Sequence, residues 1–273
     1  MHPIALPELA CPAVAATAGG QASLYTCWAK GPDDLRAAQS LRRSVFFDEM
    51  GAKPADAGFG ADGLDADHFD AFCDHLLIKF GDPRGAGDDP VVGTCRVLSP
   101  QGARSAGGYY TDTEFDMPSW HEVRQDVAEL GRSCVHGQWR RGGVIMMLWS
   151  ALGAYMHERK LGTLIGCCSV ALTDNGAVAR SLWDSLSRTH LVDESSQVVP
   201  RAPFELGSPH GSAPVPLSRL ATPALMKGYL RCGAKLLGPP AHDAAFGTAD
   251  FPMMLQLSDL SPSYRQHFLV NAN

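Results

Sequence analysis

Glu129 is the residue of this sequence best suited to acid–base chemistry. It stands in the apolar segment VAELGRSCV (127–135), whose composition predicts a buried strand. A carboxylate inside an apolar strand is costly unless it has a partner or titrates usefully. Glu129 is therefore a candidate general base for an amine nucleophile. The spacing fits an ion pair on an edge strand equally well.

A second group of residues could bind an anion. The loop Gln138-Trp139-Arg140-Arg141-Gly142-Gly143 lies between that strand and a predicted long helix. N–H groups at the start of a helix suit a phosphate, the glycines allow close approach, and the two arginines add charge. The alternative is an exposed turn with incidental arginines. The position between strand and helix favours phosphate binding.

Acidic residues gather between positions 65 and 75. The carboxylates are Asp65, Asp67, Asp70 and Asp74, and His68 and His75 stand among them. Such a group could bind a cationic amine or a hard metal ion, or could simply solvate a loop. Gly63 precedes the acids instead of following them, so the order does not fit an EF-hand calcium loop. Composition favours the solvated loop.

Three further side chains share one face of a predicted helix. Arg42, Phe46 and Glu49 follow an i, i+4, i+7 spacing, which brings them to one side of an α-helix. They would form either a core edge, with the stem of Arg42 lying along it, or the roof of a pocket.

The elements that would carry these residues alternate between strands and helices. Short apolar runs predict strands at 23–29, 75–81, 90–99, 127–135, 161–170 and 251–260. Helical periodicity predicts helices at 31–51, 142–160, 173–190 (with Thr173 or Asp174 as N-cap) and 223–237, the last running into a strand. This order indicates an α/β fold with a mixed sheet flanked by helices. A plain dinucleotide-binding fold is excluded, because no GxGxxG follows a strand.

The composition is that of an ordinary globular protein. The 273 residues are 45% hydrophobic and carry a net charge of −6, which argues against a general nucleic-acid binder. The eight cysteines form no CxxC pair, so we expect reduced thiols and no metal site. The longest apolar run has 13 residues (144–156), whereas a membrane span needs about 20. We expect a flexible lead-in at 1–22, one domain at 23–273, and a cytoplasmic protein at most peripheral to the inner membrane.

Several motifs occur in an order typical of one family. Leu41-Arg42-x-x-Val45-Phe46, Asp67-x-Phe69-Asp70, Val92-Gly93-Thr94-Cys95-Arg96 and Glu129-x-x-Arg132 resemble the acyl-homoserine lactone synthase branch of the GNAT acyltransferase fold. The segments DHLLI, VVGTCRVL, GGYYTDTEFD, ELGRSCV, LWSALGAYM and ALMKGYLRCGAKLLGPPAHDAAFGTADF are more similar to the ornithine-acyl carrier protein N-acyltransferases. The resemblance covers residues 24–268. It implies a splayed GNAT-like sheet with strands 127–135 and 164–170 adjacent at the splay.

The resemblance also implies an activity. Enzymes of this family move a 3-hydroxyacyl chain from acyl carrier protein to L-ornithine and so make lyso-ornithine lipid. Glu129 would activate the amine, and backbone N–H groups around Ser133–Val135 would hold the oxyanion. The implied substrate-binding residues are Arg42, Phe46, Asp67, Asp70, Arg96 and Arg132.

The same resemblance bears on the acyl donor. Arg140, Arg141, Gly142 and Gly143 occupy the pyrophosphate-loop position of GNAT enzymes without its usual pattern, which favours phosphopantetheine on acyl carrier protein over coenzyme A. No bound cofactor is expected. Carrier proteins are acidic, so a basic patch would dock one, with Arg132, Arg140, Arg141, Arg159 and Lys160 as candidates.

Two rival functions are kept open. A homoserine-lactone-type synthase would use S-adenosylmethionine, and the C-terminal motifs argue against it. A non-enzymatic acyl-carrier-binding protein would require a Glu129 that is exposed or paired away from the cleft.

Overall fold

Eight strands form one sheet in the computed structural model, which describes residues 22–53, 62–84, 88–120, 123–141, 143–206 and 219–260. The main path runs β1-β2-β3-β5-β6-β10-β8, and β9 pairs with β10. These strands are β1 (Ser23–Trp28), β2 (Asp74–Gly81), β3 (Val91–Leu98), β5 (Val127–Val135), β6 (Thr163–Ala171), β8 (Lys235–Leu236), β9 (Ala241–Asp243) and β10 (Thr248–Gln256). A separate short pair consists of β4 (Phe115–Asp116) and β7 (Val199–Pro200).

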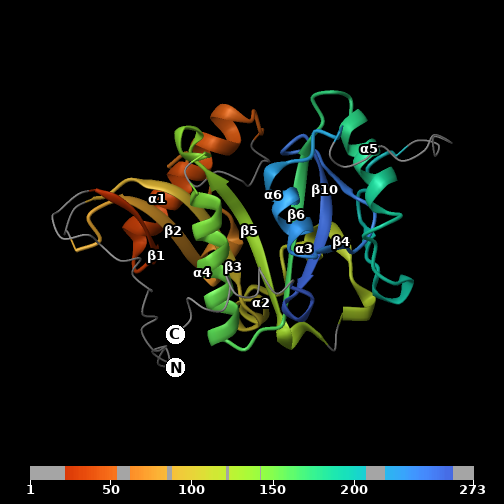
Figure 1. Cartoon of the computed structure of the whole chain (residues 1–273), viewed down its shortest axis with the longest axis horizontal. Coiled ribbons are helices and arrows are strands. Elements are labelled where there is room, and N and C mark those ends of the chain that lie inside the picture. Colours follow the sequence, from red (N-terminus) through yellow and green to blue (C-terminus); the bar gives the residue numbers. More distant parts are fainter. Residues whose placement is uncertain are drawn as a thin grey trace.

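The sheet opens between β5 and β6. All other pairs in it are antiparallel, but β5 and β6 are parallel and pair only from Val127 with Thr163 to Glu129 with Ile165. Beyond that point the two strands diverge, and Figure 1 shows the gap widening between the halves of the molecule. The sequence-based prediction that these strands lie adjacent at a splay is confirmed.

Helices cover the two halves of the sheet. They are α1 (Pro32–Arg43), α2 (Pro100–Ala106), α3 (Thr111–Glu114), α4 (Val144–Glu158), α5 (Ala177–Leu186) and α6 (Ala224–Arg231). In Figure 1, α1 and α4 lie over the half that contains β1 to β5, and α5 and α6 lie over the half that contains β6 and β10. None of the helices among the described residues has the length and apolar character needed to cross a membrane.

Strand alternation separates the core from the site. Ala128 and Leu130 of β5 join the main apolar core with residues of α4, so Glu129 between them points to the opposite face. Arg96 and Leu98 of β3 pair with Gly131 and Glu129. The charged residues of both strands therefore come to one face, away from α4.

Two predicted helices differ in detail. The first begins as expected at Pro32, with acids in its first turn, but from Ser44 to Glu49 it continues as a π-helix, which changes the spacing on which the shared face depended. The predicted N-cap at position 173 or 174 is wrong, because α5 begins at Ala177 with Gly176 as N-cap. Asp174 instead accepts a hydrogen bond from the N–H of Val178 (2.8 Å). The proposed lead-in at 1–22 lies outside the described residues except for position 22.

Candidate active site

A cavity of about 580 Å³ occupies the gap where β5 separates from β6. Glu129, Arg96 and Arg132 line it, together with the cavity-facing edge of β5 from Gly131 to Val135. Its apolar lining comes from Val45, Phe46, Met50, Leu98, Ile145, Leu225, Tyr229 and Phe246. A largely apolar cavity with a few convergent polar groups is what a long acyl chain and a reacting polar centre require.

Glu129 is held by hydrogen bonds rather than by an ion pair. It is 4% exposed, and its Oε1 accepts the N–H (2.7 Å) and the hydroxyl of Thr111. Its Oε2 accepts the N–H of Tyr110 (2.7 Å). Burial raises the pKa of Glu129 above its ordinary value, while the hydrogen bonds from Thr111 and Tyr110 oppose the rise. The edge-strand alternative is wrong, because β5 lies between β3 and β6.

A β-bulge shapes the strand beside Glu129. Arg132 and Ser133 together face Cys95 of β3, since Gly131 pairs with Arg96 and Cys134 pairs with Thr94. Arg132 adopts the left-handed conformation, with φ of 48°, which is strained for a residue other than glycine. The bulge turns this stretch of β5 toward the cavity.

Val135 presents its main chain to the open side of β5. Its carbonyl accepts the Nε–H of Arg140 (3.1 Å), whereas the N–H of the next residue, His136, bonds to Val92 on the β3 side. Both main-chain groups of one strand residue point the same way. The N–H of Val135 therefore points away from β3.

Three arginines and three aspartates form a buried cluster next to the cavity. Arg42 pairs with Asp65 (2.7 Å) and Asp70 (2.8 Å), and Arg96 pairs with Asp67 and Asp70. Burial alone would raise the pKa of Asp70, but Arg42 and Arg96 hold it well below its usual range. Asp65 and Asp70 are 2% and 5% exposed. The expectation of a solvated loop is therefore wrong.

The structure divides the predicted binding residues into two groups. Phe46, Arg96 and Arg132 line the large cavity, and Asp67 lines a smaller one. Arg132 joins the groups, because it pairs with Asp67 (3.1 Å) and its guanidinium stacks on the ring of Tyr110. Arg42 and Asp70 are absent from the described residues that line either cavity, and they support Arg96 from behind.

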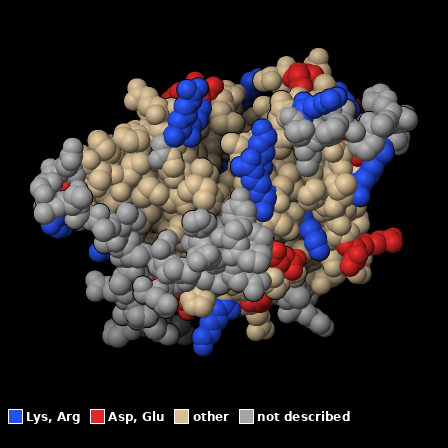
Figure 2. Space-filling model, in the orientation of Figure 1, with Lys and Arg blue, Asp and Glu red and all other residues tan. Residues whose placement is uncertain are grey.

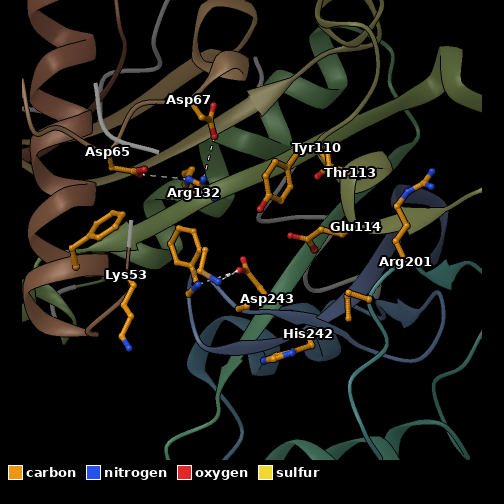
Figure 3. Close-up of a pocket in the computed structure, with 16 residues that line it drawn as sticks. Lys53, Asp65, Asp67, Tyr110, Thr113, Glu114, Arg132, Arg201, His242 and Asp243 are labelled. Carbon is orange, nitrogen blue, oxygen red and sulfur yellow. Dashed lines mark hydrogen bonds and ion pairs between the residues drawn. The ribbon is translucent and has the colours of Figure 1, made fainter. Parts of the chain in front are cut away.

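An acidic trio that the sequence analysis did not single out lies beside this cluster. One carboxylate oxygen from each of Glu114, Asp243 and Asp250 lies within 4.8 Å of the others. Glu114 and Asp243 line the smaller cavity, of about 300 Å³, and Figure 3 shows their carboxylates facing each other beside Tyr110. All three residues stand in segments that carry the family resemblance, but they are far apart in sequence and no spacing rule links them.

Burial and mutual repulsion make the acidic trio hold protons. Burial and the charges of Asp250 and Asp243 raise the pKa of Glu114 to about 8. Burial, partly offset by the hydroxyl of Thr248, raises the pKa of Asp250 to about 6. In the free protein at neutral pH the trio therefore carries less negative charge than three exposed carboxylates would.

This shift predicts a loss of stability on alkalinisation. A group whose pKa is raised on folding stabilises the protein below its unfolded pKa, about 4.3 for Glu, and this contribution is lost as the pH rises through about 8. We expect the Tm of the free protein to fall from pH 6 to pH 8.5, and the fall to be smaller by about 5 °C in Glu114→Gln. Thermal unfolding at both pH values measures this, with exposed Glu194→Gln as control. Equal falls in the wild-type and E114Q proteins would contradict it.

The loop before α4 differs from its expected role in two ways. Arg140 forms an ion pair with Glu49 (2.7 Å from Nη2 to Oε2), so part of its charge is neutralised. Arg141 is exposed, Gly143 is the left-handed N-cap of α4, and Gly142 lies outside the described residues. Arg159 and Lys160 do not flank the cavity, because they follow the far end of α4, about 22 Å from its start.

Known proteins share both the sequence and the fold. Residues 41–150 match the family described as acetyltransferase (GNAT) domain. The chain is 31% identical over 247 residues to the L-ornithine N(alpha)-acyltransferase of Brucella abortus (strain 2308), covering 88% of this chain and 86% of the relative. It is 32% identical over 262 residues to the protein of that name from Rhizobium meliloti (strain 1021), covering 93% and 87%.

The solved structure of FeeM, an N-acyl amino acid synthase from uncultured soil microbes, superposes with a TM-score of 0.50 at 11% identity and covers 92% of this chain and 98% of that one. This likeness concerns the fold alone. With the family match it confirms the predicted GNAT-like architecture. The sequence relatives, similar along nearly their whole length, establish that this chain belongs to the L-ornithine N(alpha)-acyltransferase family.

Proposed function

We propose that the protein transfers a (3-hydroxy)acyl chain from acyl carrier protein to the α-amine of L-ornithine, giving lyso-ornithine lipid. The named activity of its relatives supports this acceptor. The observation that carries the proposal is a buried carboxylate, Glu129, in an apolar cavity at the point where two parallel strands separate. Peripheral contact with the inner membrane belongs to the proposal, because the product carries an apolar chain that must reach a bilayer.

The chemistry is a single acyl transfer from sulfur to nitrogen. The neutral α-amine attacks the thioester carbonyl, a C–N bond forms and the C–S bond breaks. The amine proton passes to Glu129, directly or through one water, and then to the departing thiolate of the carrier. Glu129 suits this task, because Thr111 satisfies Oε1 twice whereas Oε2 accepts only the N–H of Tyr110. Oε2 therefore keeps a lone pair for a proton donor.

The bulged strand is the proposed oxyanion site. Charge develops on the carbonyl oxygen in the transition state, and fixed N–H donors stabilise it most. Ser133 and Val135 line the cavity, and the N–H of Val135 points away from β3. The substrate carboxylate would pair with Arg132, which lines both cavities.

The acyl carrier protein would dock above the cavity mouth. Lys227 and Arg231 stand on the exposed face of α6, and exposed Arg141 lies before α4. Figure 2 shows basic side chains over α6 and over the loop that precedes α4. Ile145 near the start of α4 and Leu225 near the start of α6 both line the cavity. A positive surface on either side of the mouth fits an acidic carrier.

Mass spectrometry tests the reaction. Purified protein is incubated with 3-hydroxyacyl carrier protein and L-ornithine, and N-acylornithine and free carrier thiol are expected in equal amounts. S-adenosylmethionine in place of ornithine distinguishes the lactone-synthase alternative. Equal turnover with the matching acyl-coenzyme A would contradict the carrier-protein donor, and no acylated product from any amine would contradict the enzyme.

Charge reversal tests the docking surface. Arg141→Glu combined with Lys227→Glu should raise the KM for the acyl carrier protein about tenfold with kcat nearly unchanged, because rim charges act mainly on encounter. The wild-type KM should rise with added salt. Lys160→Glu, at the other end of α4, is the matched control. The docking surface would be refuted by an equal KM in the two variants.

A further inference from the structure

The acidic trio lies where the two cavities adjoin. Glu114 ends α3, Asp243 ends β9 and Asp250 stands in β10. Glu114 lines the smaller cavity, Asp250 the larger, and Asp243 both. A molecule that reaches from Glu129 toward the smaller cavity therefore meets the trio.

The trio lacks the cations that neutralise the neighbouring acids. Asp65, Asp67 and Asp70 each pair with an arginine, whereas none of the trio forms an ion pair within the described part of the chain. Arg132 is near enough to lower the pKa of Asp250, but its own ion pairs are to Asp65 and Asp67.

A second observation points to an occupant. Oε2 of Glu114 is buried and has no hydrogen-bond partner among the described residues, and Asp250 is only 4% exposed. Figure 3 shows the Glu114 carboxylate directed at Asp243 and into the cavity. A buried acceptor without a donor is costly, and several buried acids without a cation are more so. The arrangement therefore suits a cationic group that brings N–H donors.

We propose that the acidic trio binds the side-chain ammonium group of the acceptor amino acid. This inference rests on the proposed function, which supplies a diamine as acceptor. An alkylammonium group has three N–H donors, one for each carboxylate. Tyr110 links the two ends of such a substrate, because its N–H bonds to Glu129 and its side chain lines both cavities.

The subsite would decide which amine is acylated. An amine held among carboxylates stays protonated and has no lone pair with which to attack a thioester. The α-amine, held near Glu129, can lose its proton and react. The trio thus gives the enzyme a preference for basic amino acids and restricts acylation to the α position.

The test compares two acceptors of equal carbon length. L-norvaline has the ornithine skeleton without the terminal amine. We expect the wild-type kcat/KM to favour L-ornithine by at least about 100-fold. Glu114→Gln should lower kcat/KM for ornithine about 10- to 100-fold, as for a lost charged hydrogen bond, and change that for norvaline less than about threefold. Asp250→Asn should act in the same direction, and Glu194→Gln is the control.

Each outcome separates the subsite from the proposed function. Equal wild-type use of both acceptors, or equal losses for both in the E114Q and D250N proteins, would overturn the subsite while acyl transfer stands. If the wild-type protein acylates neither acceptor, the proposed function itself fails. Thermal shift gives a reading without turnover: L-ornithine should raise the Tm of the wild-type protein more than norvaline does, and this difference should shrink in E114Q. Stabilisation by Mg²⁺ or Ca²⁺ but not by ornithine would make the trio a metal site and overturn the proposal.

Discussion

Glu129→Gln should lower kcat by about 10²–10⁴, the usual effect of removing a general base. The substitution keeps the size of the side chain but removes the proton acceptor. Steady-state kinetics with saturating acyl carrier protein and L-ornithine measure the change. Below neutral pH the wild-type rate should rise with pH as Glu129 ionises, and because burial raises its pKa, this limb should lie above the range of an exposed glutamate. The E129Q protein should lack the limb.

The substitution also has a structural cost that must be separated from its catalytic effect. Oε1 and Oε2 of Glu129 both accept N–H donors, and the side-chain amide introduced by E129Q would place a donor at one of these positions. A charged hydrogen bond is worth about 1.5–3 kcal/mol, so the Tm should fall as well. Rates are therefore compared well below the Tm of the variant.

Thr111→Val gives a test of position rather than of chemistry. The variant keeps the carboxylate and loses the hydroxyl that donates to Oε1. This hydrogen bond lowers the pKa of Glu129, so its loss should move the acidic limb to higher pH with a smaller loss of kcat. An E129Q protein with a near-normal kcat and a lowered Tm would assign Glu129 to structure alone.

Periodicity and apolar runs predicted most of the main-sheet strands, because burial imposes those patterns directly. The strand at 127–135 and its helix are at their predicted positions. The splay, in contrast, followed from the family resemblance. It depends on pairing that stops after Glu129, and no local pattern encodes where a parallel pair ends. The role of Glu129 was inferred from a glutamate in an apolar strand, but its partners, the N–H groups of Tyr110 and Thr111, could not be read from spacing.

The acidic segments show where composition misleads. Asp65, Asp67 and Asp70 read as a solvated loop because their neighbours are polar and small. They are buried because α1, β3 and β5 each bring one arginine to them. The acidic trio depends on α3 meeting the hairpin of β9 and β10, and these segments lie far apart in the sequence. Charges therefore have to be counted after folding before an acidic segment is assigned to solvent.

Arg42→Met should destabilise the protein by about 3–5 kcal/mol, the cost of removing one partner of a buried ion pair. Arg42 is 1% exposed and donates to Asp65 and Asp70 through Nε, Nη1 and Nη2. Methionine fills much of the space but leaves Asp65 without its closest cation. The Tm should fall by on the order of 10 °C, as measured by calorimetry.

Two further variants show whether charge causes this loss. Arg36→Met removes an exposed ion pair with Asp62, and because exposed pairs contribute about 0–1 kcal/mol, its Tm should change little. Adding Asp65→Asn to Arg42→Met removes an uncompensated carboxylate, so the double variant should recover part of the lost Tm. If the R42M protein melted within about 2 °C of the wild-type protein, a shift well below that of a broken buried pair, the cluster would not hold Arg96 and Arg132 in place. The geometry of the active site would then depend on the bulge of β5 alone.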